Sequence, residues 1–359
     1  DDPVRAGALP SVASSTSCVR SGPPPTGVED VNRLLADLVG EPALQGADVG
    51  ASVRLQDDRL IFAFGDSLRG KSFDGPRFVR NSMMVWAVDC ASVVLPPGNG
   101  ALIPDRLDGV GYWPMSLAVA HRPGYDLVLV TTQRVRTTGG SSFSFANLGP
   151  ALAVFVVPEG GTPQLVDRVD IGPDDADKSR PEWGAASAVA GGWLYLYGTA
   201  QPEETETFGF GLHVARVRPD EVLDPSRWRY WNGERWQSDA GRSAALIPAA
   251  GGVSETLSVF HQGERWFALS KRDGDLGDEL VFWTADGPTG PFTLRDPVAS
   301  APSDPSTGAV RYMPLAHPEI FTEKGSMVAS YSRNNTDFDK VLDDPALYRP
   351  RFLRVPLPR

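Results

Sequence analysis

Short runs of hydrophobic residues, separated by turn-forming residues, recur along the chain from residue 48 onward. The runs are rich in Val, Trp, Phe and Tyr, and few long stretches have helical spacing, so the pattern predicts β-strands joined by many turns. Residues 29–40, EDVNRLLADLVG, are an exception and predict a short helix. Residues 1–28 are rich in Pro, Ser and Gly and predict an irregular arm without a core of its own.

One pattern occurs five times: a strand rich in small residues, a tight turn, and a strand rich in aromatic or aliphatic residues. The turns centre on Asp57, Gly124, Gly191, Gly263 and Gly325. Their spacing of 62 to 72 residues leaves room for further strands in each unit, and radial repetition of such sheets gives a propeller. We therefore predict an all-β fold, a five-bladed β-propeller over residues 41–359 preceded by an irregular N-terminal arm and short helix over residues 1–40. The regular spacing disfavours a pair of β-sandwich domains.

The first hairpin carries an aspartate at each open end. If its turn centres on Asp57, antiparallel pairing sets Val53 opposite Ile61 and Asp48 opposite Asp66. Directly opposed side chains share a face, with Cβ atoms roughly 4.5–5.5 Å apart. Two carboxylates at such a short distance do not both ionise easily, so their pKa values differ, as a nucleophile and a general acid require. A register slip of one residue would separate them, and each Asp has a plainer alternative role in a turn.

Small residues suit the innermost strands, so the residues just before these strands should gather at one mouth of the central channel. Further candidates for substrate contact are Trp113, Trp183, Glu182, His317 and Asn334. Aromatic faces there could stack on sugar rings, Glu182 could be a third acid, and His317 and Asn334 could bind hydroxyl groups. The structural alternatives are core packing for the two Trp, a rim ion pair for Glu182, a satisfied buried His and a self-satisfied polar turn.

Charge and composition narrow the classes of partner. The net charge of −11 and pI near 4.9 argue against nucleic acid, which needs a basic footprint. No apolar run is long enough to span a membrane. With four His and no HxxH or HExxH pairing, we expect no metal centre, and without a phosphate loop or dinucleotide fingerprint we expect no cofactor. Cys18 and Cys90 could form a disulfide that ties the arm to the first blade, or be two separate thiols.

Seven short motifs follow one another along the chain. They are ADVG at residues 47–50, FGDS at 64–67, NSMMVW at 81–86, GPF at 290–292, AHPEIF at 316–321, SYSRNN at 330–335 and YRPRF at 348–352. In this order and spacing the chain resembles the actinobacterial DUF4185 group, classed as glycoside hydrolase family 183, the endo-D-arabinanases. The resemblance implies a secreted or cell-envelope enzyme, expected to be monomeric, that cleaves internal α-linkages in the D-arabinan of mycobacterial arabinogalactan and lipoarabinomannan.

The resemblance also implies roles for individual residues. Asp48 would be the acid/base and Asp66 the nucleophile of a retaining reaction, whose carboxylates lie about 5–5.5 Å apart. Asn81, in the NSMMVW motif, joins the substrate-binding candidates. Two alternatives stay open: a glycan-binding propeller without turnover, and an inverting furanosidase with Glu182 as the acid. The inverting scheme is disfavoured because the second unit offers Tyr112 and Trp113 where an acid would be expected.

Overall fold

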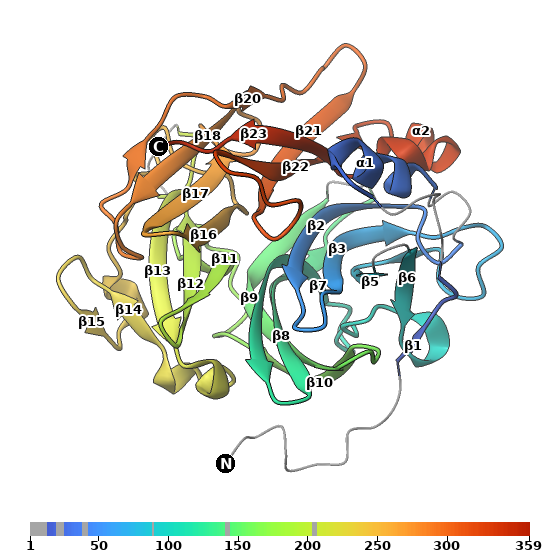
Figure 1. Ribbon diagram of the computed structural model, residues 1–359, viewed down its shortest axis with the longest axis horizontal. Coiled ribbons are helices and arrows are strands. Elements are labelled where there is room, and N and C mark those ends of the chain that lie inside the picture. Colours follow the sequence, from blue (N-terminus) through green and yellow to red (C-terminus); the bar gives the residue numbers. More distant parts are fainter. Residues whose placement is uncertain (1–12, 19–24, 38–41, 88–89, 141–143, 203–206) are drawn as a thin grey trace.

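The computed structural model describes residues 13–18, 25–37, 42–87, 90–140, 144–202 and 207–359. Five antiparallel sheets follow one another along the chain and surround a central axis, which confirms the predicted all-β, five-bladed propeller (Figure 1). The innermost strands of neighbouring blades contact one another around this axis. The alternative of two β-sandwich domains is therefore excluded.

The first two blades contain ten strands. Blade one comprises β1 (Ser14–Ser15), β2 (Gly46–Arg54), β3 (Leu60–Leu68), β4 (Phe78–Val79), β5 (Ser82–Ala87) and β6 (Cys90–Leu95). Blade two comprises β7 (Gly111–Arg122), β8 (Tyr125–Thr137), β9 (Phe145–Pro158) and β10 (Gln164–Asp170).

The remaining blades follow in chain order. Blade three comprises β11 (Glu182–Ala190), β12 (Trp193–Ala200), β13 (Gly211–Val217), β14 (Arg229–Trp231) and β15 (Trp236–Gln237). Blade four comprises β16 (Ser258–Gln262), β17 (Arg265–Lys271), β18 (Glu279–Ala285), β19 (Thr293–Leu294) and β20 (Ala299–Ser300). Blade five comprises β21 (Ala309–His317), β22 (Ser326–Asn335) and β23 (Arg351–Pro356). Two helices, α1 (Val28–Ala36) and α2 (Phe338–Asp343), lie outside the blades, together with short 3-10 turns.

The predicted hairpin turns join the two innermost strands of every blade. Gly124, Gly191, Gly263 and Gly325 all have φ values between 56° and 82°, a left-handed conformation that glycine adopts without strain. In blade one the same conformation falls on Asp58, with φ 67°. The turns are short in blades one to four, but in blade five eight residues, 318–325, separate β21 from β22.

Five apolar clusters fill the spaces between successive blades. Each cluster draws buried side chains from the facing sheets of two neighbours, as Val53 of blade one does with Val130 of blade two. The same arrangement repeats between blades two and three, three and four, four and five, and five and one. Burial of these faces from water is the main force that holds the blades in a ring.

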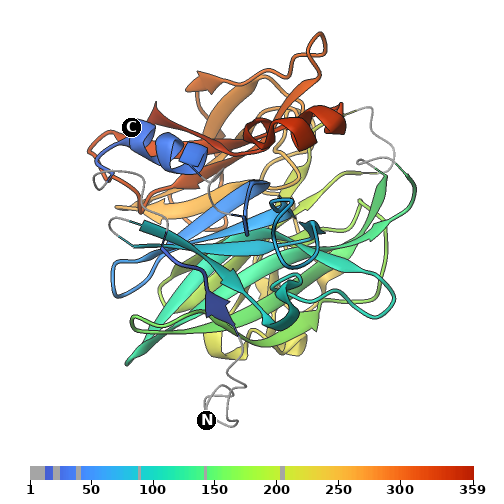
Figure 2. The same cartoon turned by 90° about the vertical axis from the view of Figure 1, so that its right-hand side faces the viewer.

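Helix α1 covers the seam between the last blade and the first. Its buried side chains Val31, Leu34 and Leu35 pack in one cluster with Phe62 of β3 and Phe352 of β23. The side chain of Asn32 donates to the carbonyl of Phe352 at 2.9 Å and accepts from its amide at 2.9 Å, as a neighbouring strand would. Figures 1 and 2 both show the helix beside β23. The predicted short helix is thus confirmed over Val28–Ala36, while residues 38–40 of the prediction lie outside the described residues. Helix α1 closes the ring.

The N-terminal arm is attached to the outer edge of blade one. Strand β1 pairs with β6, with Ser14 opposite Leu95. A disulfide joins Cys18 to Cys90, whose Cα atoms lie 5.4 Å apart, so the predicted link between arm and first blade is confirmed. The division into an arm over residues 1–40 and a propeller over 41–359 stays a prediction, as does the monomeric state. Across the described residues, no helix has the length and apolar character needed to cross a membrane.

Candidate active site

Two compensating irregularities set the geometry of the β2–β3 hairpin. Near the turn Val53 pairs with Ile61, as predicted, but closer to the open end Val49 pairs with Phe64 and Ala47 with Ser67. The ladder shifts once between Ala51 and Val49 and shifts back between Val49 and Ala47. Instead of one direct pair, the hairpin therefore sets Asp48 across from both Gly65 and Asp66.

Gly65 makes room for the Asp48 carboxylate. A Cβ atom on Gly65 would lie 2.3 Å from Asp48 Oδ1 and 3.2 Å from Val49 Cγ2. Val49 itself adopts φ 67°, an uncommon conformation for a β-branched residue. The close approach of backbone and carboxylate requires glycine here, and it turns Asp48 toward Asp66.

Two tyrosines hold Asp48, one from β21 and one from the connection between β22 and β23. Tyr312 Oη donates to Asp48 Oδ2 at 2.7 Å, and Tyr348 also donates to this carboxylate. Burial raises the pKa of Asp48 to about 6, against the opposing effect of both hydrogen bonds.

A tryptophan and an arginine hold Asp66. Trp113 Nε1 donates to Asp66 Oδ1 at 2.6 Å, and Arg80 Nη1 lies 3.4 Å from the same oxygen. Burial first, and then the negative charge of Asp48, raise the pKa of Asp66 to about 7, although Arg80 and Trp113 lower it. The two aspartates therefore interact, and near neutral pH the pair shares a proton.

Blade two fixes the partners of Asp66. The Trp113 ring packs edge to face on Phe145, with centroids 4.5 Å apart. Arg80 passes over Gly111, where a Cβ would lie 2.4 Å from its Cγ, and its other nitrogen donates to Thr137. Trp113 and Arg80 thus reach Asp66 from a surface that leaves them little freedom.

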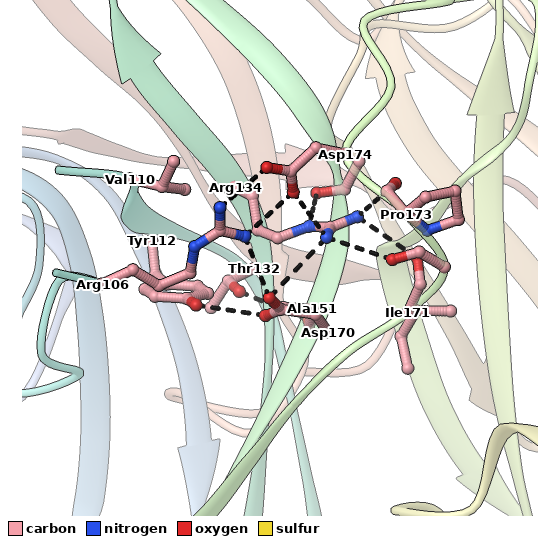
Figure 3. A network of polar contacts seen from close by, with 12 residues as sticks. Arg106, Val110, Tyr112, Thr132, Arg134, Ala151, Asp170, Ile171, Pro173 and Asp174 are labelled. Carbon is pink, nitrogen blue, oxygen red and sulfur yellow. Dashed lines mark hydrogen bonds and ion pairs between the residues drawn. The ribbon is translucent and has the colours of Figure 1, made fainter. Parts of the chain in front are cut away.

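A polar network around Arg134 and Asp174 stiffens this part of blade two (Figure 3). The buried guanidinium of Arg134 pairs with Asp174 at 2.9 Å and donates to the carbonyls of Gly172 and Pro173. Tyr112 Oη donates to Asp170 at 3.1 Å. Tyr112 and Arg134 face each other in the β7–β8 ladder, directly next to Trp113 and Gln133, so the network anchors the wall of the site.

A cavity of about 230 Å³ lies over the aspartate pair. We call it the central cavity; its polar and aromatic lining comes from blades one, two, four and five. The lining includes Asp48, Asp66, Trp113, Gln133, Phe145, Glu255, Asp275, Tyr312, Asn334 and Tyr348.

Equivalent positions of the five blades form what we call the inner ring. Its members are Asp48, Trp113, Glu182, Glu255 and Tyr312. In β2, β7, β11 and β21 the ladder is irregular at this position or within the next three residues, which re-aims side chains. The inner-ring residues of blades one, two, four and five line the central cavity.

A second group of acids faces the pair from blades three and four. Burial first, and then the negative charge of Glu255, raise the pKa of Glu182 to about 8 and that of Asp275 to about 7. Glu182 Oε1 and Asp275 Oδ1 are buried without a hydrogen-bond partner. Asn147 Nδ2 donates to Glu255 at 3.4 Å and also bonds Glu182. Glu182 is therefore mostly protonated at neutral pH and can donate to an oxygen.

The structure brings four of the predicted site residues together: Asp48, Asp66, Trp113 and Asn334 all line the central cavity. Glu182 is not in the cavity lining, but it bonds Asn147 and interacts with the charge of Glu255, which lines the cavity. Trp183 does not line the cavity; it is 5% exposed and packs in the core against Tyr230, with centroids 5.0 Å apart.

Asn81 and His317 also lie away from the cavity lining. Asn81 is buried and bonds the backbone of Ile103 and Tyr112, so it fixes a loop of blade one against blade two. His317 is fully buried, and its ring nitrogens lie 2.5 Å from Ser52 Oγ and 2.7 Å from Ser330 Oγ. The sequence placed His317 at the start of the inner strand of blade five, but β21 ends there, because the loop after it is longer than in the other blades.

Sequence reasoning missed Arg80, Asp275, Tyr312 and Tyr348. Tyr312 occupies the inner-ring position that was assigned to His317. Asp275 lies four residues after the second strand of blade four, and Asp66 lies near the end of the second strand of blade one, so the repeat offered a signal for Asp275. Arg80 and Tyr348 lie in connections between strands and carry no repeat signal.

Comparison with protein families identifies the chain. It belongs to DUF5005, a domain of unknown function, which matches residues 40–356. The resemblance to the DUF4185 endo-D-arabinanases is therefore wrong. The motifs that suggested it are short turn and strand segments, and they do not define that family. No curated protein matches the chain.

Several solved structures have a similar fold. A protein from Bacteroides ovatus, described only provisionally as a hydrolase, is 17% identical with a TM-score of 0.62 over 87% of this chain and 86% of its own. A xylan β-1,4-xylosidase from Bacillus halodurans is 10% identical with a TM-score of 0.51 over 82% of this chain and 50% of its own. The catalytic domain of a family 62 α-L-arabinofuranosidase from Coprinopsis cinerea is 9% identical with a TM-score of 0.50 over 97% of this chain and 98% of its own. At these identities the likeness concerns the fold.

Proposed function

We propose that this protein is a glycoside hydrolase that uses Asp48 and Asp66 to cleave a bond in a pentose-containing polysaccharide. The observation that carries the proposal is the aspartate pair itself: two carboxylates from one hairpin, both lining one cavity, with pKa values raised to about 6 and about 7. A pair that shares a proton supplies both a charged and a protonated carboxyl group, as glycoside hydrolysis requires. Similarity of fold to a xylosidase and an arabinofuranosidase supports the substrate class.

In a retaining reaction one carboxylate attacks the anomeric carbon while the other carboxyl group gives its proton to the departing glycosidic oxygen. Water then loses a proton to the second group and displaces the first. The earlier prediction made Asp66 the nucleophile and Asp48 the acid/base. We propose the opposite division, with Asp48 ionised between two tyrosine donors and Asp66 protonated, because burial and the charge of Asp48 both raise the pKa of Asp66.

The first experiment measures hydrolysis of arabinoxylan, linear arabinan and the D-arabinan of arabinogalactan by wild type, Asp48→Asn and Asp66→Asn. We expect each variant to lose at least about a thousandfold in kcat/KM on the substrate that wild type cleaves, since each removes one carboxylate of the pair. Asp58→Asn, at the turn of the same hairpin with a side chain 85% exposed, is the matched control. Undiminished cleavage by either site variant would overturn the proposal.

The D-arabinan substrate, the endo action and the retaining outcome rested on the overturned resemblance, so each needs its own test. The substrate panel, with analysis of the oligosaccharides released, tests the first two, and azide tests the third. Azide distinguishes the nucleophile from the acid/base. In the Asp→Ala variant that lacks the nucleophile, azide attacks the anomeric carbon directly and gives a glycosyl azide of inverted configuration. In the acid/base variant azide attacks the glycosyl-enzyme and gives the retained product. We expect inversion for Asp48→Ala and retention for Asp66→Ala. The reverse pattern would restore the earlier assignment.

The second candidate is an inverting hydrolase with Glu182 as the acid. The buried, unpartnered Glu182 Oε1 and the pKa of about 8 favour it. Its signature is an inverted anomeric product in the first turnovers, read by NMR, with loss of activity in Glu182→Gln. Binding of glycan without any product over long incubation would instead indicate a non-catalytic propeller.

We also propose that the protein acts outside the cytoplasm. The Cys18–Cys90 disulfide supports this, since disulfides persist mainly in oxidising compartments. Thiol labelling of the protein isolated from its own host under denaturing conditions checks the proposal: two free thiols per chain would contradict it.

A further inference from the structure

A second and larger cavity adjoins the aspartate pair on the side of blade one. Its volume is about 850 Å³, within the range of about 300–1,000 Å³ that is typical of ligand sites, whereas the central cavity is smaller than that range. We call it the blade-one groove. Its walls are mainly apolar and include Pro76, Phe78, Pro96, Pro97, Phe338 and Leu342.

The groove and the central cavity adjoin each other. Asp66, Phe145, Asn334 and Tyr348 line both of them. Asp66 therefore stands at the junction, and a ligand whose reacting bond lies over the pair can continue into the groove. The central cavity alone has room for little beyond the reacting unit.

Two aromatic side chains pack against each other in the wall of the groove. Phe78 of β4 and Phe338 of α2 meet edge to face, with centroids 5.9 Å apart and an interplanar angle of 83°. Phe78 stays 37% exposed and Leu342, on the same helix, 36%. One wall thus comes from blade one and the other from α2, in the connection between β22 and β23 of blade five, so the groove spans the seam of the propeller.

We infer that the blade-one groove binds the sugar units that flank the scissile bond, so that the substrate is a polymer held at several successive units. The inference rests on the proposed function and deepens it. Apolar walls suit the C–H faces of sugar rings, and the groove also carries Arg77, Arg80, Asp66 and Asp105 for hydroxyl groups. Four charged side chains in one groove make a fatty acyl chain a poor occupant, because their desolvation would be uncompensated.

Gly100 offers a way to fill the groove without disturbing the pair. It lines the groove, a Cβ added there would meet no atom within 4 Å, and its φ is −76°. Gly287 is the matched control, because a Cβ there also meets nothing within 4 Å and Gly287 lies outside both cavities. Phe208→Ala, at a position 79% exposed, is the control for Phe78→Ala.

The test compares arabinohexaose and xylohexaose with the corresponding p-nitrophenyl pentosides as substrates. For Gly100→Trp and Phe78→Ala we expect KM for the cleaved hexasaccharide to rise at least fivefold, and the ratio of kcat/KM for hexasaccharide over pentoside to fall by a similar factor. Gly287→Trp and Phe208→Ala should match wild type. Equal ratios in all five proteins, with active enzyme, would overturn the inference while the proposed function stands.

Binding separates the inference from catalysis. Calorimetry with Asp48→Asn, which keeps the groove intact, should detect hexasaccharide, and Gly100→Trp in that background should weaken the affinity at least fivefold. This result would support the groove even if no hydrolysis is found. Binding of n-octyl xyloside with no binding of either hexasaccharide would overturn the inference and indicate an acyl-binding groove.

Discussion

Gly65 is the single residue on which the geometry of the aspartate pair depends most directly. Its missing Cβ leaves space for Asp48 Oδ1, which would otherwise lie 2.3 Å away. We expect Gly65→Ala to displace the carboxylate and to reduce kcat/KM about 100-fold, as small misplacements of reacting groups do. Gly287→Ala is the control. Activity above half of wild type, with the melting temperature within a few degrees, would contradict the role given to Gly65.

The hydroxyl of Tyr312 sets the acidic side of the pH profile. Its hydrogen bond to Asp48 lowers the pKa of that carboxyl, which burial has raised to about 6. In Tyr312→Phe the bond is lost, so the pKa of Asp48 rises further. We expect the acidic limb of kcat/KM against pH to move upward by about half a unit to one unit.

The profile is measured from pH 4 to 9 on a p-nitrophenyl pentoside. Tyr331→Phe, on β22 but outside both cavities, is the control and should leave the limb in place. A fall in rate at every pH without a shift would mean that Tyr312 positions the substrate and does not tune Asp48.

The sequence predicted the site as far as local pairing and the repeat reach. Asp48 and Asp66 belong to one hairpin, and the repeat also located Trp113 and Asn334. Tyr312 reaches Asp48 from blade five, and Arg80 reaches Asp66 from a connecting loop. Which loop residue meets which blade is decided by packing of the whole ring, and no pattern within one repeat contains that information.

Among the elements, α1 stands out because it acts as a substitute strand at the edge of blade five. Asn32 satisfies both the amide and the carbonyl of Phe352 on β23. In Asn32→Ala these two groups lose their partners, and a buried unsatisfied group costs about 1–3 kcal/mol. We expect a loss of that size in the free energy of unfolding, measured by urea denaturation.

Arg33→Ala is the control on the same helix, because its side chain is 46% exposed and its pair with Asp30 lies at the surface. We expect that change to stay within about 1 kcal/mol. Equal stability of the two variants would mean that α1 does not close the ring.

The same element scale shows where sequence reading succeeds and where it fails. Glycine turns located the hairpins because a left-handed residue leaves a local chemical signal. Blade five was misread because Pro314 and an irregularity after Tyr312 interrupt β21, and because its loop is long. Counting back from Gly325 by the distance that holds in the other blades therefore reached His317.

At the scale of the whole molecule, buried carboxyl groups dominate the dependence of stability on pH. Burial raises the pKa of five acids to between about 6 and about 8: Asp48, Asp66, Glu182, Asp275 and Glu319. Between their unfolded values near 4 and these folded values, the folded chain binds more protons than the unfolded chain. Stability therefore falls as pH rises through this range.

Two histidines act in the opposite direction over part of the range. Burial lowers the pKa of His213 to about 4 and that of His317 to about 3, so stability falls as pH drops below about 6.5. Five acids outweigh two histidines, and self-repulsion from the net charge of −11 also fades toward the pI of 4.9. We therefore expect the melting temperature to be higher at pH 5 than at pH 8.

Differential scanning calorimetry from pH 4.5 to 8.5 measures the slope, and Glu319→Gln tests its cause. Glu319 bonds Ser52 across the seam between blades five and one, and glutamine can keep that bond without titrating. Removing one of the five acids should flatten the slope, because each proton released contributes about 1.4 kcal/mol per pH unit. Glu323→Gln, at a side chain 62% exposed, should leave the slope unchanged. A melting temperature that rises toward pH 8 would show that these carboxyl groups are ionised at little cost, and the proton shared by Asp48 and Asp66 would then lose its physical basis.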